Sequence, residues 1–486
     1  MKPNVIVICI DSLRADCVGP GKALSRVKTP HIDQLASESM MFDRCYAEGL
    51  PTIQVRRCFF TGHRSFPWRQ VVPDEGLQPA GPGWHPISHE EDTLAEMLHD
   101  GGYLTGLVSD TYHMFKPTMN FTRGFLSWEF IRGQENDPWR SGPMERIDLR
   151  PHVPEGEASP AVHPTVAQYL LNALDRRSEE DWQCAQVFRR AGDWLVDNHR
   201  QGPFFLWVDS FTPHELWDPP RHYADMYCPP KPGVKDLIYP QVYHQQRDRR
   251  PEIPLTPEET DRCKALYLGF VTFMDRWVGH LLEAVEKLGL FENTIVMFTA
   301  DHGTELMDKG RFGKGGDRLH PYNTRVPWFI RTPDGPRGER CDAWVQNLDL
   351  TPTLMTMLDL NRDDFHGQDA WPVAVGEAPP HREYATTGWG NSACVRDDNW
   401  AVHLTVSAAD YLDTARVYDL RTDPDEDVDV AKDNPEVVEE AAKRIEEITG
   451  PLPASSQSYQ QRAQGRTMRT YGPMRYDPAL RPGTVT

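Results

Sequence analysis

Five short apolar runs are spaced along the chain, and the segments between them have helical periodicity. The runs cover residues 4–10, 103–110, 203–211, 294–300 and 326–332, and they are rich in Val, Ile and Phe, as buried strands of a parallel sheet are. Helical patterns cover residues 92–102, 187–199, 256–289 and 347–360. Because strands alternate with helices, the pattern predicts an α/β fold with a doubly wound, mostly parallel sheet flanked by helices.

The pattern changes near residue 380. From there to residue 450 the segments are short and alternating and end in an acidic helix, which predicts a small C-terminal α+β subdomain after a large domain over residues 1–379. Within the large domain, residues 110–165 are rich in Trp, Pro and charge and are expected to form an insertion or lid. Residues 451–486 are rich in Pro, Ser, Gln and Arg, which predicts an extended tail.

Charge and cysteine content narrow the function. With 72 acidic and 52 basic residues the formal net charge is -20, which argues against a nucleic-acid or anionic-membrane partner but leaves room for a small anionic substrate held by local cations. The N-terminus has too few apolar residues for a spanning helix, so we expect no export signal and no membrane anchor. Nine cysteines without paired spacing are typical of reduced thiols, so we expect a cytoplasmic protein. Tail arginines suggest homo-oligomer contacts through Arg462, Arg466, Arg469 and Arg475.

Carboxylates stand where several predicted strands end. Asp11, Asp110, Asp209 and Asp301 are at or just past these ends, and ligands of open α/β sheets bind at that edge. Asp11, Asp301 and His302 together make a donor set for one divalent cation. Mn²⁺ or Zn²⁺ fits two carboxylates and an imidazole best, and Ca²⁺ or Mg²⁺ is compatible.

Eight ordered segments lie between residue 4 and about residue 431. Besides the spacing from Arg56 to Thr61 and Gly62, they are NVIVICIDSLRAD, TPHIDQLASES, PFFLWVDSFTPHELWDPP, IVMFTADHGTELMDKGRFGKGG, NTRVPWFIRTP, NLDLTPTLMTMLDL and VYDLRTDPDEDVDVA. Together they resemble the sulfatase family of the alkaline phosphatase superfamily. The resemblance implies the fold of that superfamily and a metal-dependent hydrolase with a covalent intermediate.

The family signature also implies which residue is the nucleophile. It reads Cys-x-Pro-Ser-Arg, then four intervening residues and Thr-Gly, with the cysteine oxidised to formylglycine. Counting back from Thr61 places the arginine at Arg56 and the nucleophile at Thr52, which would also be a metal ligand. Cys58, two residues past the arginine, is expected to be a small buried side chain.

Two departures from the family pattern bear on the substrate. A formylglycine hydrate releases sulfate by collapsing to the aldehyde, whereas Thr52 has no second hydroxyl. A phosphorylated threonine can be hydrolysed at phosphorus, so Thr52 favours phosphorus esters. Ser12 stands where many sulfatases have another metal-binding aspartate, which favours a transition metal or zinc, as in the related phosphonate monoester hydrolases.

Further roles are implied by the resemblance. Arg56 orients Thr52 and neutralises substrate oxygens, while His214 and Lys314 match the residues that contact the anion and protonate the leaving oxygen. His113 matches a Lys-x-His motif, but Thr111 replaces its lysine, which suits a less charged substrate such as a diester. A second ion on Asp209 and His214 is an alternative to the single ion that we predict.

Other features have more than one interpretation. His320 and Asn323 line the site or cap loops. The acidic stretch Asp423–Asp429 is expected to be a solvated loop. Core or lid packing, more than substrate stacking, is expected of the tryptophans Trp128, Trp139, Trp207 and Trp217.

The sequence therefore predicts a metal-dependent hydrolase that cleaves phosphodiester or phosphonate monoester bonds through a covalent intermediate on Thr52. Three alternatives remain: a sulfuric ester hydrolase, a phospho-group transferase, and a catalytically inactive sulfatase-like binding protein. The last has no need for the full set of matched residues, which argues against it. Fold identity by itself does not decide among these substrates.

Overall fold

A computed structural model describes residues 2–66, 84, 86–240 and 255–452 of the chain. Nearly all of the expected tail over residues 451–486 lies outside the described residues, and so do the four tail arginines. No helix in the described part of the chain combines the length and the apolar character needed to cross a bilayer.

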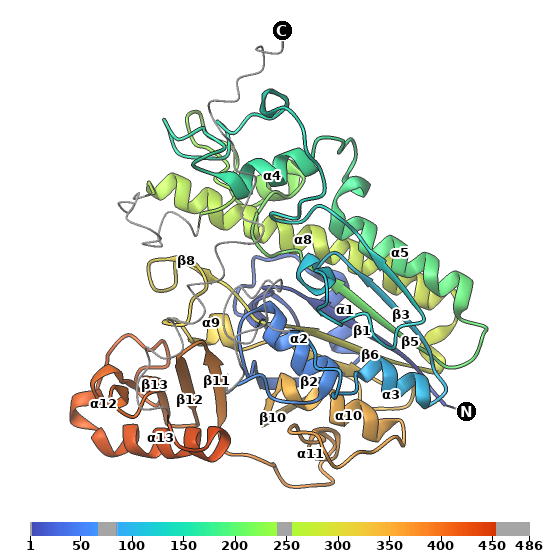
Figure 1. Ribbon diagram of the computed structural model, residues 1–486, viewed down its shortest axis with the longest axis vertical. Coiled ribbons are helices and arrows are strands. Elements are labelled where there is room, and N and C mark those ends of the chain that lie inside the picture. Colours follow the sequence, from blue (N-terminus) through green and yellow to red (C-terminus); the bar gives the residue numbers. More distant parts are fainter. Residues whose placement is uncertain (1, 67–83, 85, 241–254, 453–486) are drawn as a thin grey trace.

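The centre of the molecule is an eight-stranded sheet with the strand order β10-β2-β9-β6-β1-β5-β3-β4 (Figure 1). Strand β9 is antiparallel to β2 and β6, and the other neighbouring strands are parallel. The strands are β1 Asn4–Ile10, β2 Met40–Tyr46, β3 Leu104–Ser109, β4 Ser127–Phe130, β5 Phe204–Ser210, β6 Thr294–Ala300, β9 Trp328–Arg331 and β10 Glu339–Gln346. The predicted doubly wound, mostly parallel sheet is confirmed.

The apolar runs in the sequence did not predict strands β2, β4 and β10, because these strands lie toward the edges of the sheet. Strand β4 is an edge strand inside the segment that was expected to be a lid, and it pairs with β3. Strands β2 and β10 carry charged, partly exposed side chains in the middle or at the start. A strand with one solvated flank has no continuous apolar run, so the criterion for buried strands misses it.

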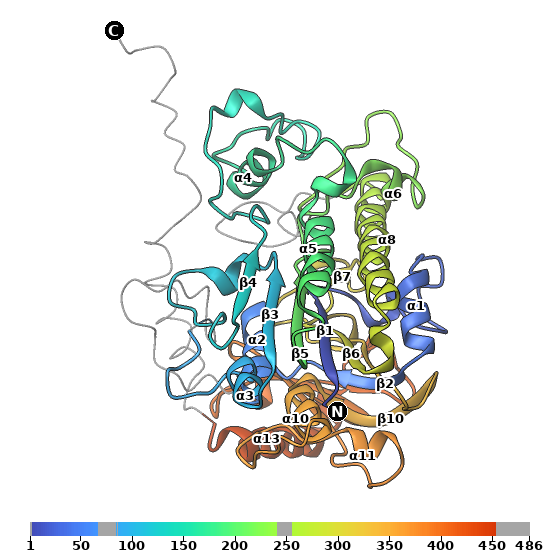
Figure 2. The same ribbon diagram turned by 90° about the vertical axis from the view of Figure 1, so that its right-hand side faces the viewer.

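Helices cover both faces of this sheet (Figures 1 and 2). On β5, the ring of Phe204 contacts Trp194 of one helical layer, and the ring of Trp207 packs against Phe59 and Phe60 of the other. Successive side chains of a strand point to opposite faces, so these contacts identify two layers. The first contains α1 Pro30–Ser37, α5 Gln183–Asn198 and α8 Pro257–Lys287, and the second contains α2 Thr52–Thr61, α3 Leu94–Asp100 and α10 Leu350–Met357.

The register of the central strands brings three carboxylates to one edge. Strand β1 is wholly buried between β5 and β6, and its last residue, Ile10, pairs with Ser210 and Ala300. The chain therefore leaves β1 at Asp11 and β6 at Asp301, side by side, beside Asp209 near the end of β5. The predicted convergence of these aspartates follows from the parallel arrangement of the three strands.

Shorter elements surround this edge. The short hairpin of β7 Glu305–Leu306 and β8 Phe312–Gly313 follows β6, and the 3-10 helix Tyr112–Phe115 follows β3. Among the described residues before 380, the other short α-helices are α4 Pro164–Asn172, α6 Arg221–Asp225, α9 Pro321–Thr324 and α11 Trp371–Ala374. Of the tryptophans assigned to packing, Trp207 and Trp217 are fully buried, whereas Trp128 is 54% and Trp139 41% exposed.

A separate antiparallel sheet forms after residue 384, with an apolar core of its own (Figure 1). It consists of β11 Ala385–Trp389, β12 Ser392–Arg396, β13 Trp400–Thr405 and β14 Arg416–Asp419, with α12 Tyr411–Thr414 and α13 Pro435–Thr449 beside it. The backbone of Gly388 in β11 hydrogen-bonds to Glu48 and Leu50, just before α2. The division of the chain into domains at residues 379 and 380 stays a prediction.

Candidate active site

Asp11, Asp301 and His302 converge at the edge of the central sheet, as predicted. All three are fully buried, and their ligand atoms lie within 4.8 Å of one another. The Nε2 atom of His302 is 3.5 Å from Oδ2 of Asp301 and 4.0 Å from Oδ1 of Asp11. These separations are too long for good hydrogen bonds but close to the roughly 3–3.5 Å expected between ligands of one ion bound at about 2.0–2.2 Å.

The tautomer of His302 supports a metal-binding role. Its Nδ1 atom is 2.8 Å from the carbonyl oxygen of Gly303, which can only accept, so Nδ1 carries the proton. The lone pair of Nε2 then faces the two carboxylates, and this buried nitrogen has no hydrogen-bond partner among the described residues. A ligating histidine commonly donates its other ring N–H to a backbone carbonyl in this way. The residues present therefore fit one divalent ion.

The pKa shifts of these three residues also favour a bound cation. Burial, together with the negative charge of Asp301, raises the pKa of Asp11 well above its usual range. Burial opposes ionisation of Asp301 as well, but His302 and Arg56 outweigh it and lower the pKa of Asp301 to about 2. Burial lowers the pKa of His302 to about 4, so this imidazole is neutral near pH 7 and able to ligate a metal.

Arg56 joins the helix that carries Thr52 to the carboxylates of the sheet edge. Its fully buried guanidinium donates to Asp301 Oδ2 at 2.6 Å and lies 3.1 Å from Asp11 Oδ2. Its Nε and Nη2 atoms donate to Asp209 at 3.0 and 2.8 Å. Because these N–H groups point at protein oxygens, the structure assigns Arg56 a positioning role, and its contact with substrate oxygens stays a prediction.

Thr52 is the first residue of α2 and is 2% exposed. Its carbonyl oxygen accepts a 3.3 Å hydrogen bond from Arg56 Nη1, four residues along the helix and within reach because of the helical repeat. The nucleophile position is therefore linked through one guanidinium to Asp301. Thr52 as nucleophile and as a metal ligand stays a prediction.

Cys58 is buried on the same helix, as expected. It is more than an apolar filler, since its Sγ donates to Oε2 of the buried Glu48 at 3.0 Å. Burial and the neighbouring Glu48 raise the pKa of the thiol well above its usual range. A buried thiol held in the protonated form is a poor nucleophile, so Cys58 does not compete with Thr52.

Thr111 occupies the place of the missing lysine and binds the protein rather than a ligand. Its hydroxyl donates to Asp209 Oδ1 at 2.6 Å, and the indole of Trp207 donates to Oδ2 at 3.2 Å. Together with Arg56 these donors engage both oxygens of Asp209. This arrangement disfavours the alternative of a second ion held by Asp209 and His214.

Lys314 and His214 meet at a carboxylate that the sequence analysis did not identify, that of Glu215. Lys314 Nζ donates to Glu215 Oε2 at 2.8 Å and to Ser12 Oγ at 3.3 Å, and Ser12 Oγ in turn donates to Asp11 Oδ1 at 2.9 Å. His214 Nδ1 lies 2.5 Å from the carbonyl oxygen of Glu215. Although burial opposes it, the charge of Lys314 lowers the pKa of Glu215 to about 2. In the sequence, only its position next to His214 could have indicated a role for Glu215.

His113 lies close to His214, against the same aromatic ring. The ring centroid of Phe211 is 4.1 Å from that of His214 and 5.9 Å from that of His113. His113 Nε2 is 3.4 Å from Oε2 of Glu135, a second carboxylate that the sequence did not indicate. Burial lowers the pKa of His113 to about 3, so the imidazole is neutral near pH 7. This placement suits a contact with the neutral part of a ligand better than an anion contact.

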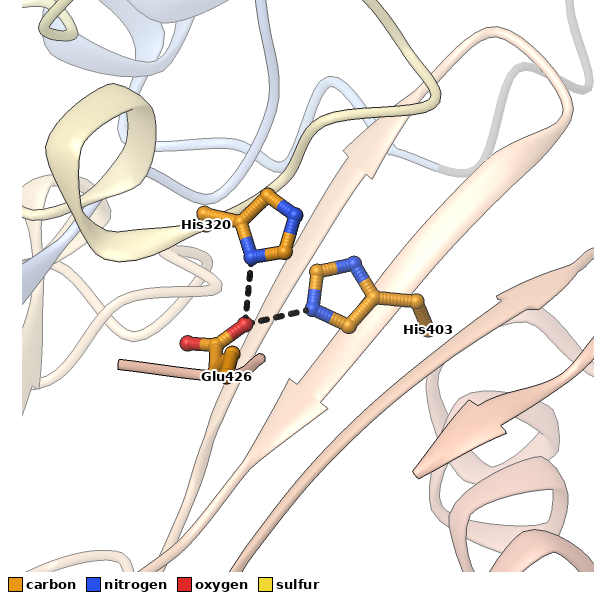
Figure 3. A group of neighbouring side chains, drawn as sticks. All are labelled: His320, His403 and Glu426. Atoms are coloured by element: carbon orange, nitrogen blue, oxygen red, sulfur yellow. Dashed lines mark hydrogen bonds and ion pairs between the residues drawn. The ribbon is translucent and has the colours of Figure 1, made fainter. Parts of the chain in front are cut away.

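A second group of two histidines and a carboxylate joins the large domain to the antiparallel sheet (Figure 3). Glu426 Oε2 is 2.6 Å from His320 Nδ1 and 3.1 Å from His403 Nε2, while Arg396 donates to its other oxygen. These are hydrogen-bond distances, shorter than the spacing at His302, so we assign the group as a clamp between the two sheets and not as a metal site.

This clamp changes two interpretations. The expectation that Asp423–Asp429 is solvated was wrong for Glu426, which is 2% exposed because the clamp folds it inward. His320 is at the N-cap position of α9, but its side chain makes no capping hydrogen bond and binds Glu426 instead. The side chain of Asn323 donates to the carbonyl of Arg318 at 2.8 Å, so the loop-capping interpretation describes Asn323, whereas His320 belongs to the clamp.

Comparison with known proteins agrees with this architecture. A family model described as Sulfatase matches residues 3–360. The chain is 26% identical over 407 residues to an arylsulfatase of Clostridium perfringens, an alignment that covers 75% of this chain and 76% of that protein. It is 27% identical over 388 residues to human iduronate 2-sulfatase, covering 72% of this chain and 64% of that protein.

Solved structures of similar fold include two phosphonate monoester hydrolases. The enzyme of Agrobacterium radiobacter matches with a TM-score of 0.68 at 21% identity, over 91% of this chain and 95% of that chain. The enzyme of Silicibacter pomeroyi matches with a TM-score of 0.69 at 21% identity, over 94% and 97%. At such identities the likeness is one of fold.

Proposed function

Since this chain belongs to the sulfatase family and is a hydrolase of that family, we propose that it cleaves phosphodiester or phosphonate monoester bonds through a covalent intermediate on Thr52. Thr52 carries the proposal: a threonine stands at the buried start of α2, where Arg56 connects it to the carboxylates of the metal site. The family generally uses a divalent metal ion. Such an ion, held by Asp11, Asp301 and His302, would polarise the oxygens of the ester and of Thr52.

The first step joins Thr52 to phosphorus. As the bond from Thr52 Oγ to phosphorus forms, the bond to the leaving oxygen breaks, and the alcohol departs with a proton supplied by Lys314. The hydroxyl proton of Thr52 replenishes that donor. Lys314 is positioned for this role, because its Nζ is held 2.8 Å from Glu215 Oε2.

The second step frees Thr52. Water attacks phosphorus, the bond to Thr52 Oγ breaks, and the oxygen of Thr52 regains its proton from the attacking water. His214 can relay that proton, because its Nδ1 donates to the carbonyl of Glu215 and its Nε2 remains an acceptor. No oxidised cysteine is needed for this turnover, since a phosphothreonine breaks at phosphorus.

A sulfuric ester hydrolase is the second candidate. The observation that favours it is the naming of the curated relatives, an arylsulfatase and an iduronate 2-sulfatase. Against it stands Thr52, which lacks the second hydroxyl with which formylglycine expels sulfate. The two candidates differ in the atom attacked, and parallel substrates distinguish them.

The test measures hydrolysis of bis-p-nitrophenyl phosphate, p-nitrophenyl phenylphosphonate and p-nitrophenyl sulfate, each with Mn²⁺ and with Zn²⁺. Wild type, Thr52→Ala and Cys58→Ala are compared, the last being a matched loss of another small polar group from the same buried helix. We expect diester or phosphonate hydrolysis that disappears in Thr52→Ala and persists in Cys58→Ala. Faster sulfate hydrolysis would replace this proposal with the second candidate, and activity that survives Thr52→Ala would exclude Thr52 as the nucleophile.

A further inference from the structure

We propose that Glu215 is a specificity-determining residue: by neutralising Lys314 it makes the site prefer esters with one negative charge over phosphate monoesters with two. The inference rests on the proposed function in one respect, that the charged group of the substrate binds at Lys314. Glu215 lies in the segment 203–220 that resembles the family, but the resemblance assigned it no role.

The ion pair between Lys314 and Glu215 is held in place and shielded from water. Lys314 is 8% exposed and Glu215 is fully buried, with 2.8 Å between Nζ and Oε2. The other carboxylate oxygen accepts from the hydroxyl of Thr304 at 3.3 Å, and His214 Nδ1 lies 3.3 Å from Oε2. A carboxylate fixed on several sides stays next to the lysine when a ligand arrives.

Such a pair attracts an anion much less than a free lysine does. The field of an adjacent positive and negative charge falls off faster with distance than that of a single charge, so the gain from a second negative charge on the ligand is largely offset by Glu215. One negative charge can still be accommodated through hydrogen bonds from the remaining Nζ–H. The second negative charge of a dianion gains little attraction from this pair, so a dianion binds no better than a monoanion there.

Neighbouring residues do not replace the positive charge of Lys314 that Glu215 neutralises. Arg56 directs its guanidinium at Asp301 and Asp209 and lies against Asp11, and Thr111 offers only a hydroxyl, already donated to Asp209. Glu135 adds another carboxylate beside His113. Within the described part of the site, carboxylates outnumber cationic side chains, which a bound divalent ion only partly offsets.

A purely structural role for Glu215 makes a different prediction. If the carboxylate served only to hold Lys314 in position, Glu215→Gln would lower kcat/KM for all substrates by a similar factor. Charge selection instead changes the ratio between substrates. The ratio of kcat/KM for a dianion to that for a monoanion is therefore the informative readout.

The experiment uses the metal-loaded full chain at pH 8, where a phosphate monoester is a dianion because its second pKa is about 6. The ratio of kcat/KM for p-nitrophenyl phosphate to that for bis-p-nitrophenyl phosphate is compared in wild type and Glu215→Gln. Asp275→Asn is the control, because it removes a buried carboxylate that caps α1 away from the site. We expect Glu215→Gln to raise the ratio by about tenfold or more, as removal of one nearby charge does, and Asp275→Asn to leave it unchanged.

An unchanged ratio in folded Glu215→Gln would overturn the proposal. Should that variant fail to fold, inhibition of wild type by dimethyl phosphate and by methyl phosphate gives the answer without a variant. Dimethyl phosphate, a monoanion, is expected to bind at least about tenfold more tightly at pH 8, and tighter binding of methyl phosphate would overturn the proposal. If the preferred substrate proves to be the sulfate ester, the proposed function fails while this test stands, because a sulfate ester also carries one charge.

Discussion

Arg56 and Asp301 are joined by a buried hydrogen bond of 2.6 Å although 245 positions separate them in the sequence. The same guanidinium reaches the carbonyl oxygen of Thr52 and the carboxylate of Asp209. One side chain thus connects the start of α2 to the ends of β5 and β6. The position of Thr52, the predicted nucleophile, relative to the predicted metal ligands depends on this arginine.

Arg56→Met is expected to destabilise the protein strongly. The substitution keeps an apolar stem but leaves buried carboxylates without their counter-ion, and breaking a buried pair in this way costs about 3–5 kcal/mol of the free energy of unfolding. Urea denaturation measures the loss. Arg150→Met is the control, since the side chain of Arg150 is 79% exposed and its surface pair with Asp148 is expected to add little to stability. Equal losses in the two variants would contradict the assignment.

We expect one divalent ion per chain after loading with excess Zn²⁺ or Mn²⁺ and desalting. Elemental analysis checks the stoichiometry. His302→Ala removes a ligand and is expected to lose the ion, whereas His403→Gln alters the clamp of Figure 3 and is expected to retain it. Two ions in wild type and one in His403→Gln would show that the clamp binds metal after all.

Metal affinity is expected to rise with pH. Burial and Asp301 raise the pKa of Asp11, so the metal-free protein holds a proton that the ion must displace. Deprotonation of Asp11 removes this competition as the pH increases. Titration calorimetry in two buffers of different ionisation enthalpy detects the released proton. Identical apparent enthalpies in both buffers would mean that Asp11 is already ionised without metal.

His113 is expected to make the metal-free protein acid-sensitive. Its pKa is about 3 in the folded protein because of burial, against about 6.5 in the unfolded chain. Below about pH 6.5 the unfolded chain therefore binds a proton that the folded protein does not, and stability falls by up to about 1.4 kcal/mol per pH unit until the pH approaches 3. Urea denaturation at pH 7 and pH 5 is expected to give a smaller difference in His113→Gln than in wild type. If the free energy of unfolding changed equally between pH 7 and pH 5 in both proteins, His113 would be solvent-exposed and not buried.

Glu426→Gln is expected to loosen the antiparallel sheet from the large domain. The substitution removes the charge that faces Arg396 and weakens the hydrogen bonds to His320 and His403, a loss of about 3 kcal/mol for a broken buried pair. A lower melting temperature and faster limited proteolysis near residue 380 are the readouts. Asp427→Asn, at a side chain that is 68% exposed, is the control and should behave as wild type.

Much of the fold was readable from the sequence because its information is local. Strand β1 is an unbroken apolar run since both of its faces are buried, and helical periodicity over residues 256–289 predicted α8. Strands β2, β4 and β10 lacked such runs because they lie near the sheet edges. Their pairing depends on neighbours far away in the chain.

The candidate site divides in the same way. By itself the sequence determined the aspartates at the strand ends and the histidine beside Asp301, because strand polarity is a short-range property. The assignment of Thr52 and Arg56 came from the resemblance to the family signature. Only the tertiary structure decided the partners of Glu215, Glu135 and Glu426. In a polar segment a carboxylate looks solvated, and burial by residues from distant strands and loops is what turns it into an ion-pair partner, a histidine partner or a clamp.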